Sequence, residues 1–155
     1  MTDKLIIGYL YNKHLNLYGD NGNIEILVSR ALARNIETEV KEINIDTKIP
    51  EAFVSDINFV FMGGGPDSAQ KDVYEDLLQS KGSFIKEYIN NGGVGLYVCG
   101  SYQLLGRHYK ASDGTVLQGL GVFDVYTENF GSKKPRCIGN TVASSIVHRA
   151  GHIAS

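Results

Sequence analysis

The sequence predicts an α/β fold: a mostly parallel sheet with helices on both faces, of the flavodoxin-like kind, and an antiparallel extension after residue 112. Apolar, strand-like runs alternate with stretches of helical periodicity. Two of those runs end in glycine-bearing turns, at residues 63–65 and at Gly100. Because the carboxyl ends of parallel strands meet at one edge of a sheet, we expect these two turns to lie there together.

Length and charge narrow the class of protein. The chain has 155 residues, an ordinary size for the single domain that we expect over residues 1–155. Its formal net charge of -2 predicts no nucleic-acid partner. No apolar run approaches the ~20 residues of a membrane span, and the run at residues 5–11 lacks the cleavage site of a signal peptide. We therefore expect a cytoplasmic protein with a small-molecule or protein partner.

The chain opens with a predicted strand, a loop and a helix. Residues 5–10 are apolar enough for a strand, and from residues 24 to 35 apolar side chains recur at helical spacing. The loop between them lacks the G-x-G-x-x-G fingerprint, and Asp20 would repel a phosphate, which disfavours a nucleotide site. We expect Asp20 to complement the helix dipole and Asn21 or Asn23 to cap the helix.

The next two predicted strands lead to a glycine loop. Residues 38–45 alternate polar and apolar side chains, whereas residues 57–62 are almost entirely apolar. The second strand runs into Gly63-Gly64-Gly65, and consecutive glycines raise the entropic cost of ordering the chain. They allow backbone N–H groups to approach a developing oxyanion. A tight turn with nothing bound explains them equally well, and the residues alone leave both interpretations open.

A cysteine stands between the next predicted strand and helix. Residues 67–91 predict one or two helices with a break at 80–82, and residues 94–98 predict an interior strand. Cys99 follows directly, and Gly100 begins a short helix. A nucleophile on such a turn is exposed at the sheet edge, where the N–H groups of the helix favour a thiolate and glycine at 100 tolerates the strain. A buried structural cysteine is the alternative.

The rest of the chain predicts short strands and no metal site. Residues 112–115 form a predicted turn, and strand candidates follow at 116–127 and 138–142. The two cysteines, Cys99 and Cys137, lie in unlike contexts without the spacing of metal ligands. We expect reduced thiols and no bound metal.

Taken together, these blocks resemble the class I glutamine amidotransferase domains of the cobyric acid synthase-like type. Within that family the chain is most similar to the glutaminase subunits of lipid II isoglutaminyl synthase. Residues 15–20 are the part most specific to this cell-wall subfamily, and the cysteine block is shared with cobalamin-pathway relatives. The resemblance rests on residues 15–24, 61–67, 98–106, 114–121, 126–128, Arg136 and 139–140.

The resemblance implies glutamine hydrolysis, with ammonia passed to an ATP-dependent, Mur-ligase-like subunit that amidates the D-glutamate of lipid II in peptidoglycan synthesis. ATP and Mg²⁺ are then expected on that partner, and no cofactor on this chain. The implied roles are Cys99 as nucleophile, the backbone at Gly64 and Gly100 as oxyanion donors, Arg136 as the clamp for the α-carboxylate of L-glutamine, and Gln103 as a support of the glutamine pocket. The alternative for Arg136 is a solvated basic residue that binds no substrate.

The chain departs from this family at two points. Ser101 stands where the family usually has a second glycine, and its small size should be tolerated. Family members continue further and carry their catalytic histidine downstream; His148 and His152 do not match its position. We therefore expect a domain that is incomplete at its C-terminal part, with no histidine beside the thiol. The alternatives are a non-catalytic glutamine-binding or interaction subunit, a cobalamin-pathway amidotransferase, and a cysteine-elbow protein of the deglycase or chaperone type.

Overall fold

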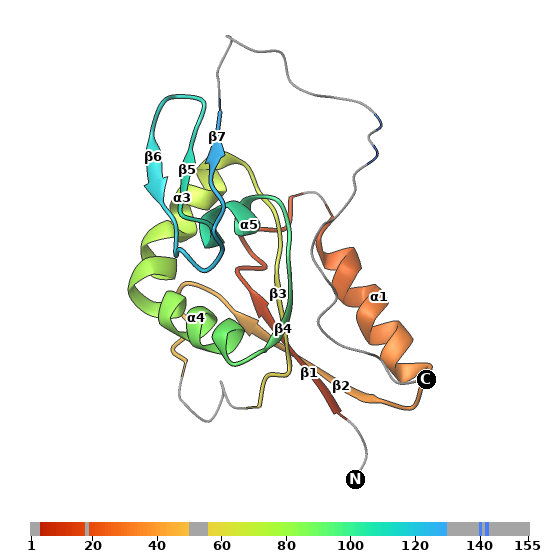
Figure 1. The fold of residues 1–155 in the computed structure, drawn as a ribbon. Helices are drawn as coiled ribbons and strands as arrows, with labels where there is room; N and C mark the ends of the chain where they lie inside the picture. The colour runs from red at the N-terminus through yellow and green to blue at the C-terminus, as the bar shows by residue number, and fades with distance from the viewer. Residues whose placement is uncertain (1–3, 18, 50–55, 130–139, 141, 143–155) are drawn as a thin grey trace.

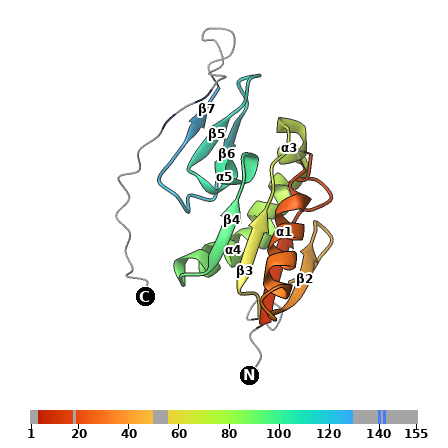
Figure 2. The same cartoon turned by 90° about the vertical axis from the view of Figure 1, so that its right-hand side faces the viewer.

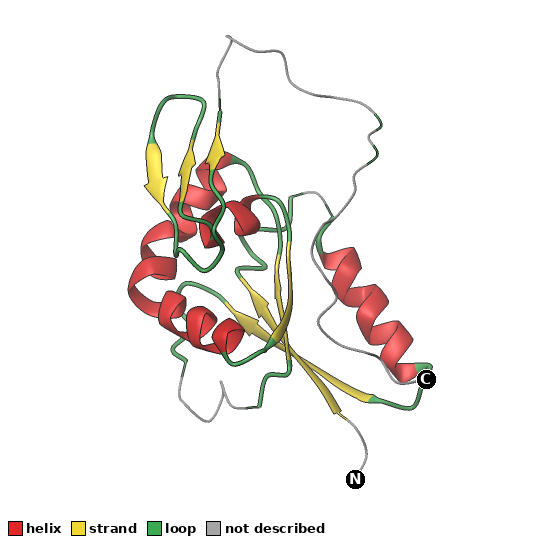
Figure 3. Cartoon of the chain, viewed as in Figure 1, coloured by secondary structure: helices red, strands yellow, loops and turns green. Residues whose placement is uncertain are grey.

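Strands and helices together make up most of the first two thirds of the chain (Figures 1 and 3). The computed structural model describes residues 4–17, 19–49, 56–129, 140 and 142. Its elements are β1 (Lys4–Leu10), α1 (Asn21–Leu32), β2 (Glu37–Ile43), β3 (Phe59–Met62), α3 (Asp67–Asp76), η1 (Leu77–Lys81), α4 (Gly82–Asn90), β4 (Val94–Tyr97), α5 (Gly100–Leu105), β5 (His108–Lys110), β6 (Val116–Gln118) and β7 (Thr127–Glu128).

The main sheet has four parallel strands in the order β2-β1-β3-β4, which confirms the predicted α/β fold. Parallel neighbours need crossover connections, and helices make the crossovers from β1 to β2 and from β3 to β4. In this register Tyr9 lies beside Phe61, and Phe61 beside Leu96. These three side chains therefore point to the same face of the sheet.

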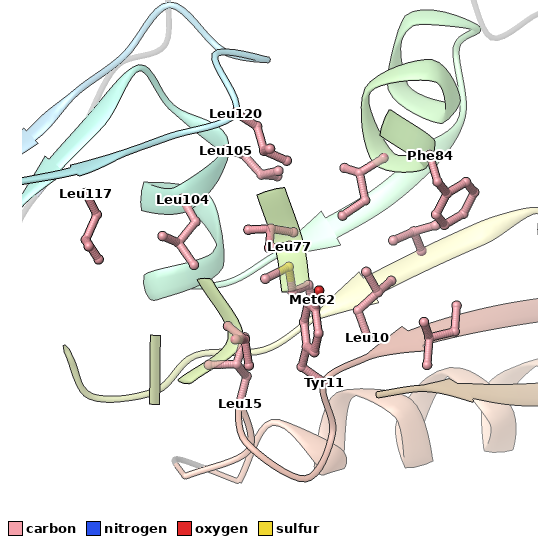
Figure 4. Close-up of a cluster of buried hydrophobic side chains, with 14 of the residues drawn as sticks. Leu10, Tyr11, Leu15, Met62, Leu77, Phe84, Leu104, Leu105, Leu117 and Leu120 are labelled. Atoms are coloured by element: carbon pink, nitrogen blue, oxygen red, sulfur yellow. The ribbon is translucent and has the colours of Figure 1, made fainter. Parts of the chain in front are cut away.

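Helices lie on both faces of this sheet, α1 on one and α3 and α4 on the other (Figure 2). On the α1 side, Ile24 of the helix packs with Ile7, Tyr9 and Phe61 of the strands. The larger core lies on the other side and reaches from β1 and β3 through α4 to α5; Figure 4 shows part of it. Burial on both faces explains why β1 and β3 are apolar almost throughout.

The strand before Cys99, predicted as an interior strand, lies at the edge of the sheet that the described residues form. Among the described strands, β4 pairs with β3 alone. Val94 and Leu96 are 60% and 41% exposed. They point to the face that α1 occupies, but α1 packs on β1 and β3. An apolar run shows what a strand can pack against, and does not fix the position of the strand in the sheet.

The residues after α5 form a second, three-stranded sheet in the order β6-β5-β7. β5 and β6 are antiparallel and flank the predicted turn at 112–115, where Asp113 accepts a hydrogen bond from the Thr115 N–H at 2.8 Å. β7 is parallel to β5. The predicted antiparallel pairing is therefore present, in a separate sheet that begins at His108 and does not extend the first. The strand candidate at 138–142 falls mostly outside the described residues.

Two helix boundaries differ from the prediction. Helix α1 begins at Asn21, whose N–H donates to the side-chain oxygen of Asn16 at 2.8 Å; Asp20 is the N-cap residue, and its side chain makes no capping hydrogen bond. The break expected at 80–82 is a π-helical turn, η1, that joins α3 to α4. In that turn the helix geometry changes without interrupting the chain's helical path.

Candidate active site

Cys99 occupies the turn from β4 into α5. Its backbone angles are φ 52° and ψ -113°, a region that residues with a side chain rarely adopt. The strained backbone is that of Cys99. The sequence predicted the strain at Gly100, but Gly100 has no positive φ. The thiol is exposed, which excludes the interpretation as a buried structural cysteine. Strain of this kind is typical of functional turns.

The glycine loop after β3 lies directly against this turn. A Cβ added at Gly64 would lie 2.9 Å from the Cβ and 3.6 Å from the Sγ of Cys99. On the opposite side, a Cβ at Gly63 would meet the backbone oxygen of Leu15 and lie 2.9 Å from the Cβ of Asp20. The loop thus lies between the cysteine turn on one side and Leu15 and Asp20 on the other. Its bare backbone is what permits both approaches.

Gln103 and Gly100 both contact Gln70, a residue that was not predicted from the sequence. Gln70 of α3 donates from Nε2 to Oε1 of Gln103 and to the carbonyl of Gly65, both at 3.3 Å. A Cβ at Gly100 would lie 2.6 Å from the same Nε2 atom. The sequence contained one signal for Gln70. This residue lies three positions before Val73, which places a polar side chain on the buried side of the helix.

Ser101 fills the place of the second glycine without disturbing the turn. It is fully buried, and its hydroxyl lies 2.8 Å from the carbonyl oxygen of Met62 and 2.9 Å from that of Val98. The single hydroxyl proton can serve one of these acceptors at a time. Ser101 therefore links the ends of β3 and β4 beneath the thiol, in agreement with the expected tolerance.

A buried phenol lies in the electrostatic neighbourhood of the thiol. Tyr109 donates to Oδ1 of Asp67 at 2.6 Å. Burial first, then this hydrogen bond, the charge of Asp67 and the proximity of Cys99 raise the pKa of Tyr109 well above its ordinary value. The phenol therefore stays protonated at neutral pH. Within the described ranges no carboxylate is hydrogen-bonded to Cys99, and Asp67 accepts its hydrogen bond from Tyr109.

Part of the expected site lies outside the described residues, namely Arg136, His148 and His152. Of the histidines that the structure describes, none is hydrogen-bonded to Cys99. His108 lies 3.5 Å from a carboxylate oxygen of Glu128 and stacks on Tyr126 at 5.2 Å between ring centroids. The part of the chain covered by the structure contains no cluster of His, Cys, Asp or Glu that could hold a metal ion. It also contains no helix long and apolar enough to cross a membrane.

Comparison with known proteins relates most of the chain to one family. A profile of the CobB/CobQ-like glutamine amidotransferase domain matches residues 6–152. The chain is 42% identical over 142 residues to subunit GatD of lipid II isoglutaminyl synthase (glutamine-hydrolyzing) from Staphylococcus aureus strain N315, a match that covers 92% of this chain and 56% of that protein. The identity to the Streptococcus pneumoniae (strain ATCC BAA-255 / R6) subunit of the same name is 38% over 128 residues, 81% of this chain and 47% of that one.

A second group of relatives matches less of the chain. A probable cobyric acid synthase of Methanococcus maripaludis strain C6 is 37% identical over 76 residues, which cover 44% of this chain and 15% of that protein. The chain spans about half the length of the GatD relatives that it matches.

Proposed function

Because the chain belongs to the CobB/CobQ-like glutamine amidotransferase family, we propose that it hydrolyses L-glutamine through a thioester on Cys99. The observation that carries this proposal is the exposed thiol on a strained strand-to-helix turn, with the bare backbone of Gly64 against it. An exposed cysteine in such a turn can reach a substrate that a buried thiol cannot.

In the first step the sulfur of Cys99 attacks the side-chain amide carbon of glutamine. A C–S bond forms, the C–N bond breaks, and ammonia leaves with the proton that the thiol gave up. In the second step water adds to the thioester carbon, the C–S bond breaks, and glutamate and the thiol are released. The sum is one glutamine and one water converted to glutamate and ammonia.

Each step passes through a tetrahedral oxyanion, for which we propose backbone donors at Gly64 and Gly100. Glycine at 64 leaves its peptide group open beside Cys99. Gly100 is the first residue of α5, and N–H groups in the first turn of a helix have no acceptor within that helix. Donors placed in advance stabilise charge as it develops, which is the largest single contribution in many acyl transfers.

Two further residues complete the proposed glutamine pocket. Arg136 would bind the α-carboxylate, because a guanidinium group matches a carboxylate with two parallel hydrogen bonds. Gln103 lies on α5, one turn beyond Cys99, and its side-chain oxygen is held by Gln70. That hydrogen bond leaves the Nε2 donors of Gln103 for the substrate.

The ammonia is proposed to serve a ligase. The GatD relatives are named as subunits of a glutamine-hydrolysing lipid II isoglutaminyl synthase, and the chain matches them over far more of its length than it matches cobyric acid synthase. We therefore favour delivery to a Mur-ligase-like subunit that binds ATP and Mg²⁺ and amidates the D-glutamate of lipid II. Delivery to a cobalamin-pathway synthetase is the alternative.

The test is ammonia release from glutamine by the chain, alone and with its candidate ligase subunit. Cys99→Ala should abolish release and the mass adduct formed with a glutamine analogue. Cys137→Ala is the matched control, since it removes the other thiol, and both signals should persist. Activity that survives Cys99→Ala would exclude Cys99 as the nucleophile.

A second candidate, a glutamine-binding subunit without turnover, is favoured by one observation. Neither His14 nor His108 is hydrogen-bonded to Cys99 in the structure, and loss of a general base typically slows a reaction about 10²–10⁴-fold. A persistent thioester without steady ammonia release would support this candidate. Full turnover by the isolated chain would exclude it.

A further inference from the structure

Gln70 is a buried polar side chain beneath the cysteine turn. It is 2% exposed, on the side of α3 that also buries Val73. Its Nε2 group donates to the carbonyl oxygen of Gly65 and to Oε1 of Gln103. The first acceptor belongs to the glycine loop after β3, and the second belongs to the helix after Cys99. The Nε2 group of one carboxamide therefore joins the two segments that enclose the thiol.

The same side chain accounts for the glycine that follows the nucleophile. A Cβ at position 100 would lie 2.6, 2.7 and 3.0 Å from Nε2, Cδ and Cγ of Gln70. The backbone of Gly100 has no positive φ that would itself require glycine. Gly100 therefore lacks a side chain because the carboxamide of Gln70 packs against its Cα. Gln70 therefore contacts the residue that directly follows Cys99 in the chain.

Gln70 is a costly choice for a purely structural position. Its Oε1 atom is buried and has no hydrogen-bond partner among the described residues, and a buried unpaired carbonyl oxygen is destabilising. Methionine or leucine would fill a similar volume without that cost. The two N–H donors are what an apolar side chain could not supply.

We propose that Gln70 is a positioning residue for glutamine hydrolysis. It holds the glycine loop and α5 in the arrangement in which the N–H groups at Gly64 and Gly100 face the oxyanion. This inference rests on the proposed glutaminase function. Because the oxyanion exists only in the transition state and the intermediate, loosening its donors should lower kcat more than it raises KM.

The experiment compares Gln70→Met with Val73→Ala in the full chain, both in a Cys137→Ala background. Gln70→Met removes the donors and keeps the length, whereas Val73→Ala creates a cavity in the core on the same helix and retains both hydrogen bonds of Gln70. For Gln70→Met we expect about ten-fold slower acylation by the chloromethyl ketone analogue of glutamine and a similar fall in kcat, with KM within about two-fold. Alkylation of Cys99 by iodoacetamide, which needs no oxyanion donors, should change less than about two-fold.

Val73→Ala should give the opposite pattern, with a lower urea midpoint and acylation close to the parent rate. Equal acylation by the parent and Gln70→Met would overturn the proposal. If Gln70→Met does not fold, Gln70→Asn replaces it in the experiment, because asparagine keeps the amide on a shorter side chain. Unchanged acylation by Gln70→Asn would again overturn the proposal.

Hydrogen exchange separates failure of this inference from failure of the glutaminase proposal. Gln70→Met should speed amide exchange in residues 63–66 and 99–105, and Val73→Ala should not do so selectively. If the parent chain neither acylates nor turns over glutamine, the glutaminase proposal fails, and unchanged exchange in these segments would overturn the positioning role as well. Faster exchange there would support the link that Gln70 makes.

Discussion

At the scale of single residues, the candidate site depends on positions where the backbone comes close to a neighbour. Cys99 has a positive φ, Gly64 brings its bare Cα to Cys99, and Gly100 does the same to Gln70. A side chain at Gly64 would press on the turn that presents the thiol, and one at Gly100 would displace the carboxamide of Gln70. Substitutions there should therefore affect chemistry more than folding.

Gly64→Ala should lower glutamine turnover about 10²-fold, since its Cβ would press on Cys99 and shift the proposed oxyanion donor. Gly22→Ala is the matched control, because nothing lies within 4 Å of its added Cβ. In helix α1 it should leave turnover unchanged and raise stability by up to about 1 kcal/mol. Ammonia release and urea unfolding measure the two effects. Parent-like turnover by Gly64→Ala would contradict the close approach.

Tyr11→Phe should show a pH-dependent loss of stability. Tyr11 is fully buried and donates to Oδ2 of Asp76 at 2.8 Å, and burial first, then this hydrogen bond, raises the pKa of Tyr11 far above its ordinary value near 10. Above about pH 10 the unfolded chain loses this proton and the folded chain keeps it. The free energy of unfolding then falls by up to about 1.4 kcal/mol per pH unit.

Phenylalanine lacks that titration. At pH 7 we expect Tyr11→Phe to be about 1–2 kcal/mol less stable than the parent, from loss of a hydrogen bond to a carboxylate. Urea unfolding between pH 7 and 11 should show this difference shrinking above about pH 10. The other tyrosines titrate in both proteins and cancel in the comparison. A difference that stays constant with pH would show that Tyr11 titrates alike in the folded and unfolded chains.

At the scale of elements, the π-helical turn η1 allows a lysine to enter the core. The Lys81 side chain is 1% exposed, and its Nζ lies 2.8 Å from Oδ1 of Asp76 and 2.8 Å from the carbonyl oxygen of Ile45. Asp76 also accepts from Tyr11. Helix α3, the turn η1, the strand end of β1 and the chain after β2 are thus joined through one buried network.

Lys81→Met should destabilise the protein by about 3–5 kcal/mol, because it leaves the largely buried Asp76 carboxylate without its cation. Lys71→Met is the control: Lys71 pairs with Asp113 at 2.9 Å, but both side chains are largely exposed, so its urea midpoint should stay near that of the parent. Similar midpoints for the two variants would show that the Lys81 network contributes little.

At the scale of the whole molecule, the two cores lie on opposite faces of the main sheet, and among the described elements none pairs with the outer edge of β4. The exposed side chains of Val94 and Leu96 continue the apolar face that α1 covers at β1 and β3. The sequence of β4 contains neither charge nor proline. An edge strand of this kind favours pairing with another chain.

Val94→Lys should therefore change the free energy of unfolding by no more than about 0.5 kcal/mol, as at other exposed positions. It should also reduce any self-association seen in sedimentation velocity, since edge lysines oppose strand pairing. Val60→Lys, at a fully buried position of the adjacent β3, should unfold the protein. A large loss of stability in Val94→Lys would mean that another part of the protein covers β4.

The sequence by itself determined the local features of this protein. Periodicity distinguishes strands from helices, and glycines mark turns, so the parallel α/β fold and the exposed Cys99 between a strand and a helix could be predicted. The approach of the glycine loop to Cys99 followed from one topological rule, that parallel strands end at a common edge. The roles proposed for Arg136, Gln103 and the oxyanion donors came from family resemblance and stay predictions.

Only the tertiary structure decided which distant residues meet. Gln70 and Gln103 are 33 positions apart, and Tyr11 and Asp76 are 65 apart. It also decided that β4 lies at the edge of the described sheet and that the short strands after α5 form a sheet of their own. Local pattern reports which face of an element is apolar. The partner that covers that face is chosen by packing among all the elements at once, because contacts between distant residues leave no periodic signal in the chain.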